Sequence, residues 1–263
     1  MTKKKKKLTK KQKEKRKKLI QKRVKQYLPL AIVLILLIAL SIFITVDKPQ
    51  PKKEEPKINI DVIEEIKEKD GINIKQLQEN YQNEDIVGYL RIPEVIELPI
   101  VKTIDNEYYL NHLLNREKNI EGTPFIDYRV NFGDRKILIY GHSGKEEDLP
   151  FLQLHKYEDI SFYEEHPTMY LYSEEKKYTY EIFSYYLETK DYDYVNIQSF
   201  GGLTWLEHLE KLKNKSNYSI PVTLTDNSKI LILQTCEVGE NAAKGKYKLL
   251  IGVLTKEEDN NYA

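Results

Sequence analysis

Apolar positions along this chain follow a helical period first and an alternating, strand-like period later. Between residues 58 and 81 they recur at helical spacing on either side of Asp70-Gly71, which predicts two short amphipathic helices. After residue 86, short apolar runs are separated by Pro, Gly and charged residues, as is typical of β-strands. The runs that predict strands are 86–92, 98–101, 123–128, 136–140, 169–172, 177–186, 222–224, 229–233 and 248–254.

Two helical stretches interrupt the predicted strands. Residues 108–114 form a short one, and residues 203–212 carry leucines along one face. About eight short strands with helical insertions predict a mainly β fold of the α+β class, closed or nearly closed into an eight-stranded β-barrel. We assign residues 81–258 to this one domain, which is long enough for a sizeable core, and residues 259–263 to a C-terminal tail.

The N-terminal part of the chain predicts a membrane anchor. Residues 1–26 form a basic tail, with 15 Lys or Arg among the first 25 residues and Glu14 as the only acid. Residues 27–46 carry no charge, and about 20 apolar residues span the hydrocarbon core of a bilayer. The end of this segment is bulky and β-branched, which favours a retained single-pass helix over a cleaved signal peptide. Residues 47–80 then form a stalk and the helical segment.

Charge sets the expected topology and partners. The basic tail belongs on the cytoplasmic side of the cell membrane, which puts the domain outside. Residues 26–263 contain 27 basic and 40 acidic residues, a net charge of about −13. A lysine run can bind nucleic acid, but the adjoining apolar span favours a lipid surface, and the acidic domain argues against nucleic acid.

The only cysteine, Cys236, follows the apolar run 230–235, so a strand would present its thiol at a rim. The competing interpretation is a buried cysteine that acts as a small hydrophobe. A nucleophilic thiol needs a polar or cationic neighbour. Among five histidines, His142 ends a strand in the same way, whereas His208 lies in a helix beside Trp205 and is expected to be structural. The sequence contains no metal-ligand cluster, Walker loop or dinucleotide fingerprint, so we expect no metal and no cofactor.

These residues resemble a known family. Tyr140-Gly-His142 after one strand, Leu233-Gln-Thr-Cys236 after another and an N-terminal anchor together resemble a sortase. The segments that resemble class B sortases are Ile86-Val-Gly-Tyr-Leu-Arg-Ile-Pro93, Asp105-Asn-Glu-Tyr-Tyr-Leu110, Gly122-Thr-Pro-Phe-Ile-Asp-Tyr128 and Glu237 after the cysteine. The resemblance covers about residues 83–256 and implies the sortase β-barrel.

The resemblance also implies a reaction. Sortases are cysteine transpeptidases on the outer face of Gram-positive cells. Cys236, as thiolate, would attack the threonine carbonyl in a C-terminal sorting signal of an exported protein, and His142 would protonate the leaving amine. The thioacyl enzyme would then react with an amine of a peptidoglycan precursor or of a pilin lysine. An anchor beside both substrates raises their effective concentration.

The sequence departs from the family at its third catalytic residue, an arginine on the strand after the cysteine. No arginine follows Arg135, and the family spacing falls on Lys246. Lys244 and Lys248 are the alternatives in register, and a backbone N–H is a further one. A lysine lacks the planar guanidinium fork, and losing an oxyanion donor costs about 10²–10³ in rate. A weak or inactive sortase-fold scaffold, and a cysteine protease with water as acceptor, therefore remain alternative hypotheses.

The resemblance implies substrate contacts as well. Those expected to bind the sorting signal are Asn106, Leu110, Tyr140, Tyr194, Val195, Thr235 and Glu237. The alternatives are that Leu110 is helix core and that Tyr194 is an ordinary surface tyrosine.

Overall fold

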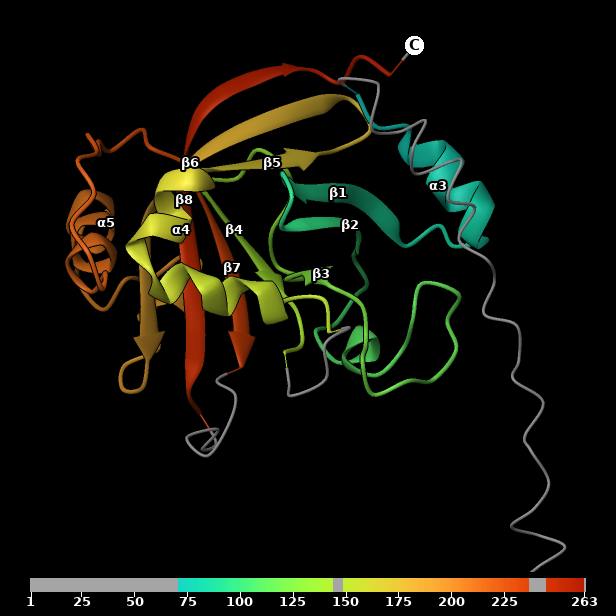
Figure 1. Cartoon of the computed structure of the whole chain (residues 1–263), viewed down its shortest axis with the longest axis horizontal. Coiled ribbons are helices and arrows are strands. Elements are labelled where there is room, and N and C mark those ends of the chain that lie inside the picture. Colours follow the sequence, from blue (N-terminus) through green and yellow to red (C-terminus); the bar gives the residue numbers. More distant parts are fainter. Residues whose placement is uncertain (1–70, 144–148, 237–244, 263) are drawn as a thin grey trace, which may run out of the picture. The chain divides into compact units, whose positions relative to one another are not determined.

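The computed structural model describes residues 71–143, 149–236 and 245–262 (Figure 1). The basic tail, the predicted anchor 27–46 and the first helix predicted within 58–81 lie outside the described residues. Within the described ranges, no helix is both long enough and apolar enough to cross a membrane.

Eight strands close into a barrel, as the spacing of apolar runs predicts. They are β1 (Ile86–Ile92), β2 (Ile96–Val101), β3 (Phe125–Ile126), β4 (Lys136–Tyr140), β5 (Thr168–Tyr172), β6 (Lys176–Glu188), β7 (Ile230–Cys236) and β8 (Tyr247–Asp259). Around the barrel their order is β1-β2-β3-β4-β7-β8-β6-β5, and β5 pairs with β1. Two pairs, β2 with β3 and β4 with β7, are parallel, and the other six are antiparallel.

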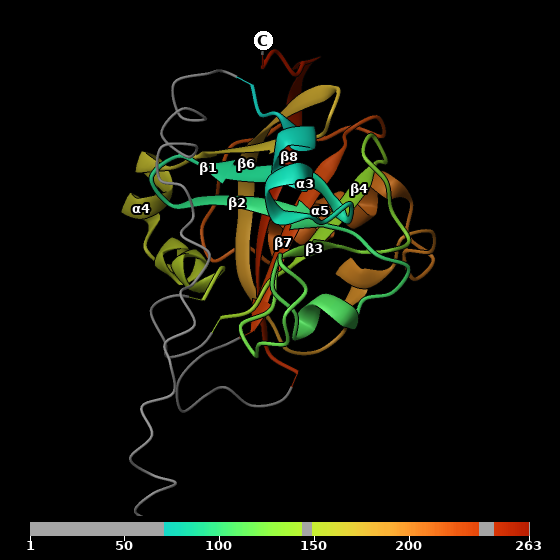
Figure 2. The same cartoon turned by 90° about the vertical axis from the view of Figure 1, so that its right-hand side faces the viewer.

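Helices are short and lie outside the barrel wall. They are α3 (Ile74–Tyr81), α4 (Ile160–Glu165) and α5 (Trp205–Asn214), with 3-10 helices η1 (Tyr108–Leu110), η2 (Leu152–Glu158) and η3 (Asp193–Val195). Figure 2 looks onto α3, which packs on β1 through Ile74 and Leu77. The helix predicted at 108–114 is therefore a single 3-10 turn.

The prediction of a strand at 222–224 is wrong. This segment has no regular structure, and its apolar residues pack outside the barrel against α5 instead of pairing in the sheet. Pro221 precedes it and cannot donate to a ladder. The carbonyl of Val222 accepts a hydrogen bond from Lys213 Nζ (3.1 Å), which fixes the segment beside the helix.

Strands β4 and β7 are continuous apolar runs because both of their faces are covered. One face contributes to the interior of the barrel, and the other packs against α5. The interior residues of these two strands are Ile137, Ile139, Leu231 and Leu233, and the outer residues are Leu138, Ile230 and Ile232. The pair is thus held rigidly at the centre of two apolar layers.

The outer layer gives a stability prediction. Leu209→Ala on α5 is expected to lower the free energy of unfolding by about 2–5 kcal/mol, because the side chain is 0% exposed and its loss leaves a cavity. Urea unfolding, followed by the fluorescence of the single tryptophan Trp205, measures the change. Leu203→Ala is the control, since Leu203 is 36% exposed and its loss should cost less than about 1 kcal/mol. Equal losses of stability in the two variants would contradict the conclusion that α5 is held to the barrel by buried apolar contacts.

Candidate active site

The two strand ends that the sequence singles out meet at one rim of the barrel. Parallel pairing sets Tyr140 opposite Gln234, and Gly141 N–H donates to the Gln234 carbonyl (3.1 Å). His142 and Cys236 each come two residues later on their strands, so they reach the same edge in matched register. Both are partly exposed. The parallel pair therefore brings the backbone positions of His142 and Cys236 to the same edge of the sheet.

The His142 ring is oriented by the backbone of η1. Its Nε2 lies 2.7 Å from the Leu110 carbonyl, which can only accept, so this nitrogen carries a proton. The backbone of Gly122, at φ +61°, packs closely against η1. A side chain could not fit at this position, because a Cβ would lie 2.5 Å from the Tyr109 carbonyl oxygen and 2.9 Å from that of Leu110. The Leu110 side chain is 40% exposed, so it is not helix core.

Cys236 is a free, partly buried cysteine at the end of β7. Burial raises the pKa of its thiol, so the thiolate needs help to form at neutral pH. Its carbonyl accepts from Ser143 Oγ (2.6 Å), and His155 Nε2 lies 3.3 Å from the same hydroxyl. Sequence reasoning missed both residues. The only signal for Ser143 is its position after His142, and η2 brings His155 from a segment with no strand-end pattern.

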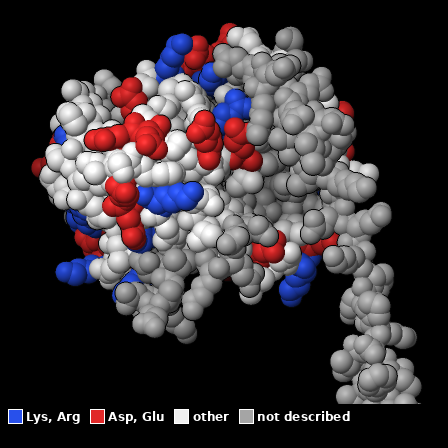
Figure 3. Space-filling view, viewed as in Figure 1, with Lys and Arg blue, Asp and Glu red and all other residues white. Residues whose placement is uncertain are grey.

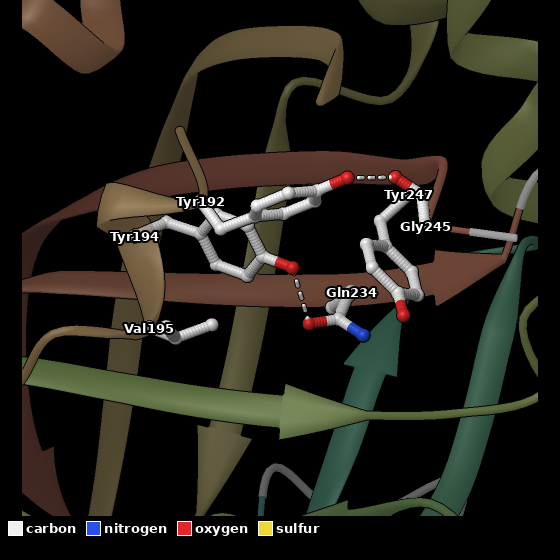
Figure 4. A pocket seen from close by; sticks show the side chains of 6 residues that line it. All are labelled: Tyr192, Tyr194, Val195, Gln234, Gly245 and Tyr247. Atoms are coloured by element: carbon white, nitrogen blue, oxygen red, sulfur yellow. Dashed lines mark hydrogen bonds between the residues drawn. The ribbon is translucent and has the colours of Figure 1, made fainter. Parts of the chain in front are cut away.

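A pocket of about 400 Å³ lies on the outer face of β7 and β8 (Figure 4). Strand alternation puts the Cys236 side chain on the same face as Gln234, which lines this pocket. Tyr194 Oη donates to Gln234 Oε1 (2.8 Å), and Tyr192 Oη donates to the Gly245 carbonyl. The lining residues are Tyr192, Tyr194, Val195, Gln234, Gly245 and Tyr247.

The η3 turn that forms one wall of this pocket is tied to the barrel by hydrogen bonds from two basic side chains. Lys136 Nζ donates to the carbonyls of Tyr194 (3.0 Å) and Asn196 (2.7 Å). Arg129 Nη2 donates to the Val195 carbonyl (3.1 Å). Burial lowers the pKa of Lys136 to about 7. Tyr194 and Val195, predicted from the sequence as substrate contacts, thus occupy a fixed wall, and Tyr194 is buried.

Tyr140 points its hydroxyl at a buried carboxylate. Tyr140 Oη donates to Asp127 Oδ2 (2.7 Å), and Arg129 binds both carboxylate oxygens. Burial alone would raise the pKa of Asp127, but the hydrogen bonds from Arg129 and Tyr140 outweigh it and lower the pKa to about 2. The network fixes β3, the end of β4 and η3 together. Tyr140 therefore packs behind the site, and its hydroxyl is already engaged.

This network predicts a pH-dependent stability. Asp127→Asn is expected to lower the free energy of unfolding by roughly 2 kcal/mol at pH 7, because the pKa of Asp127 falls to about 2 in the folded chain. A depressed folded-state pKa stabilises above about pH 4. The difference between wild type and variant should therefore shrink as the pH falls from about 4 to about 2.

Urea unfolding at neutral pH and near the folded-state pKa of Asp127 measures that difference. Asp226→Asn, at an exposed position, is the control and should change little at either pH. A difference for Asp127→Asn that stays constant with pH would mean that the carboxylate charge is not what stabilises the fold.

The remaining predicted residues are distributed around this rim. Asn106 Oδ1 accepts from the Tyr128 N–H (3.0 Å), so its carbonyl group holds the exit of β3. Thr235 is buried, and its hydroxyl has no partner among the described residues. Lys248 is buried and ion-paired with Glu158. Lys246 immediately precedes β8 and stays a prediction. Glu237 and Lys244 lie outside the described residues.

The face around α4 is acidic. The η2–α4 segment exposes Glu158, Asp159, Glu164 and Glu165, and Figure 3 shows acidic side chains gathered over this part of the molecule. The described domain thus presents the negative charge that its composition predicts.

The chain is similar to known proteins in sequence and in fold. Residues 90–252 match the sortase domain. Sortase B of Listeria monocytogenes is 34% identical over 177 residues, which are 66% of this chain and 72% of that protein. The crystal structure of Clostridium perfringens sortase B superposes with a TM-score of 0.61 at 29% identity, covering 69% of this chain and 99% of that one. A sortase B complexed with triglycine has a TM-score of 0.64 at 25% identity, over 74% and 92% of the two chains. The chain therefore belongs to the sortase family of cysteine transpeptidases, in its class B branch.

Proposed function

We propose that this chain is a membrane-anchored transpeptidase that cleaves a C-terminal sorting signal of exported proteins and joins them to an amine. The observation that carries the proposal is the in-register parallel pairing of β4 and β7. It brings His142 and Cys236 to one rim, beside a pocket large enough for a side chain of a bound peptide.

The reaction that fits these two groups has two steps. The Cys236 thiolate attacks the threonine carbonyl carbon, and a C–S bond forms. The C–N bond then breaks, and the leaving amine takes a proton from His142. In the second step an incoming amine attacks the thioester, passes its extra proton to His142 and releases the thiolate. Because burial raises the pKa of the thiol, we expect a slow first step at neutral pH.

The acceptor and the location follow from separate arguments. A structural neighbour is complexed with triglycine, which supports an amine at the end of a small peptide as acceptor. A peptidoglycan precursor would supply such an amine, and the side-chain amine of a pilin lysine is the alternative acceptor. Residues 27–46 would anchor the enzyme in the cell membrane with the basic N-terminus in the cytoplasm and the barrel outside.

The proposal is tested with the full-length chain in detergent micelles. The substrates are a library of internally quenched peptides that each contain one threonine, and triglycine is the amine. We expect cleavage after threonine, a product joined to triglycine, and, without triglycine, an acyl adduct on Cys236 in the intact mass spectrum.

Each alternative hypothesis predicts a different result. Cleavage that never yields a triglycine product would indicate a hydrolase with water as acceptor. Peptide binding without adduct or cleavage would indicate a scaffold, which the absence of any arginine after Arg135 favours. Either result would contradict the transpeptidase proposal.

A further inference from the structure

Strand β8 places a tyrosine, and not a lysine, opposite the nucleophile. In the antiparallel pairing of β7 with β8, Cys236 lies directly across from Tyr247. Directly opposed residues share a face, with Cβ atoms about 4.5–5.5 Å apart. Tyr247 therefore stands on the thiol side of the sheet and is the nearest β8 side chain to Cys236 on that face.

The lysines at this end of β8 are directed elsewhere. Lys248 shares its face with Leu250, whose side chain lies in the barrel interior, and it is buried against Glu158. Lys246 immediately precedes β8, and if the alternation of the strand continued by one residue it would share the face of Lys248, away from the thiol. Arg129, which lies near η3, has its guanidinium bound to Asp127 and to the Val195 carbonyl.

The Tyr247 hydroxyl is available to a ligand. It lines the pocket and makes no hydrogen bond to any residue in the described part of the chain. Its ring packs edge to face against Tyr192, with centroids 6.0 Å apart, so the side chain is supported. In Figure 4 the hydroxyl of Tyr247 lies on the same side of β7 and β8 as the Gln234 amide. It takes no part in the hydrogen bond between Tyr192 and Gly245, which lies at the other end of the Tyr247 side chain.

We propose that Tyr247 is a catalytic residue whose hydroxyl donates a hydrogen bond to the substrate carbonyl oxygen when Cys236 attacks. This inference rests on the proposed function. As the C–S bond forms, the carbonyl electron pair moves onto oxygen, and the Tyr247 O–H stabilises that charge without giving up its proton. The pair returns when the C–N bond breaks. A donor aimed at a developing oxyanion contributes about 10²–10³ in rate.

The test uses a tetrahedral adduct, so it does not depend on turnover. The probe is N-acetyl-threoninal, whose aldehyde adds the Cys236 thiol to give a hemithioacetal, and the control ligand is the corresponding alcohol. In the full-length chain, Tyr247→Phe should weaken the aldehyde Kd at least tenfold and leave the alcohol Kd within threefold. Tyr247→Arg should recover most of the aldehyde affinity, because a guanidinium also donates.

Control variants separate this role from packing. Tyr170→Phe removes a hydroxyl from β5, far around the barrel order from Cys236, and should leave the aldehyde Kd unchanged. An unchanged aldehyde Kd in Tyr247→Phe would overturn the proposal, as would a tenfold loss in Lys246→Met alone. An arginine variant no better than phenylalanine would also overturn it.

The same probe distinguishes failure of this inference from failure of the proposed function. If the wild-type chain forms the hemithioacetal but never joins a peptide to triglycine, the transpeptidase proposal fails while Tyr247 is still tested. If the wild-type chain forms no hemithioacetal at all, Cys236 is not a competent nucleophile, and both fail.

Discussion

Replacing Cys236 with alanine is expected to eliminate peptide cleavage, lowering kcat/KM by roughly 10⁴- to 10⁶-fold. Alanine cannot form the thioester, and the chain has no second cysteine to substitute for it. Initial rates with the best peptide of the threonine library measure the loss. Iodoacetamide labelling should give one adduct on the wild-type chain and none on the variant.

The fold should survive this change. Cys236 ends β7 and is partly exposed, so alanine is expected to alter the free energy of unfolding by less than about 1 kcal/mol. A folded variant that kept a hundredth of the wild-type rate would point to another nucleophile. The hydroxyl of Ser143, bound to the Cys236 carbonyl, would be the first candidate.

Replacing His142 with glutamine is expected to lower kcat/KM on an amide substrate by about 10²- to 10⁴-fold, the usual contribution of a general acid. An amine leaves poorly unless it is protonated, whereas p-nitrophenolate leaves without a proton. The kcat/KM of His142→Gln on a p-nitrophenyl ester of the same peptide should therefore fall less than tenfold. The difference between the losses of kcat/KM on the two substrates measures the contribution of proton donation by His142 to the rate.

A histidine elsewhere in the fold is the matched control for this measurement. His166→Gln changes the C-cap residue that follows α4, and kcat/KM for both substrates should stay within threefold of wild type. Equal losses on ester and amide in His142→Gln would assign the imidazole to deprotonating the thiol. In that case the raised pKa of Cys236 would be the barrier that it lowers.

The sequence predicted the first and last residues of a strand correctly where a buried apolar run begins and ends with the strand. Strands β1 and β4 begin and end as expected, because apolar runs stop at Pro93 and at Gly141. Strand β8 runs on to Asp259 through charged residues that pair with β6. Those residues are ordered by backbone hydrogen bonds, which leave no hydrophobic signal. The 3-10 helices η2 and η3 were missed, whereas η1 lies within the short helix predicted at 108–114.

The site residues that lie at strand ends were predicted from the sequence. The residue that the pairing of β7 with β8 places opposite the thiol was not. Motif and pattern together pointed to His142 and Cys236. Which side chain faces the thiol from β8 depends on pairing Cys236 with Tyr247, and spacing along the chain could not settle a shift of one residue. Ser143 and Lys136 bind backbone carbonyls, and His155 lies against the Ser143 hydroxyl; a sequence positions none of these partners.

Because β4 and β7 are hydrogen-bonded neighbours, the distance between acid and nucleophile is independent of the long connection that joins them. That connection carries η2, α4, β5, β6, η3 and α5, and η3 forms a wall of the pocket. Evolution can therefore lengthen or rewrite it to accept new peptides while the reacting pair is inherited intact. Chimaeras that exchange this crossover between homologues should change peptide preference without loss of turnover.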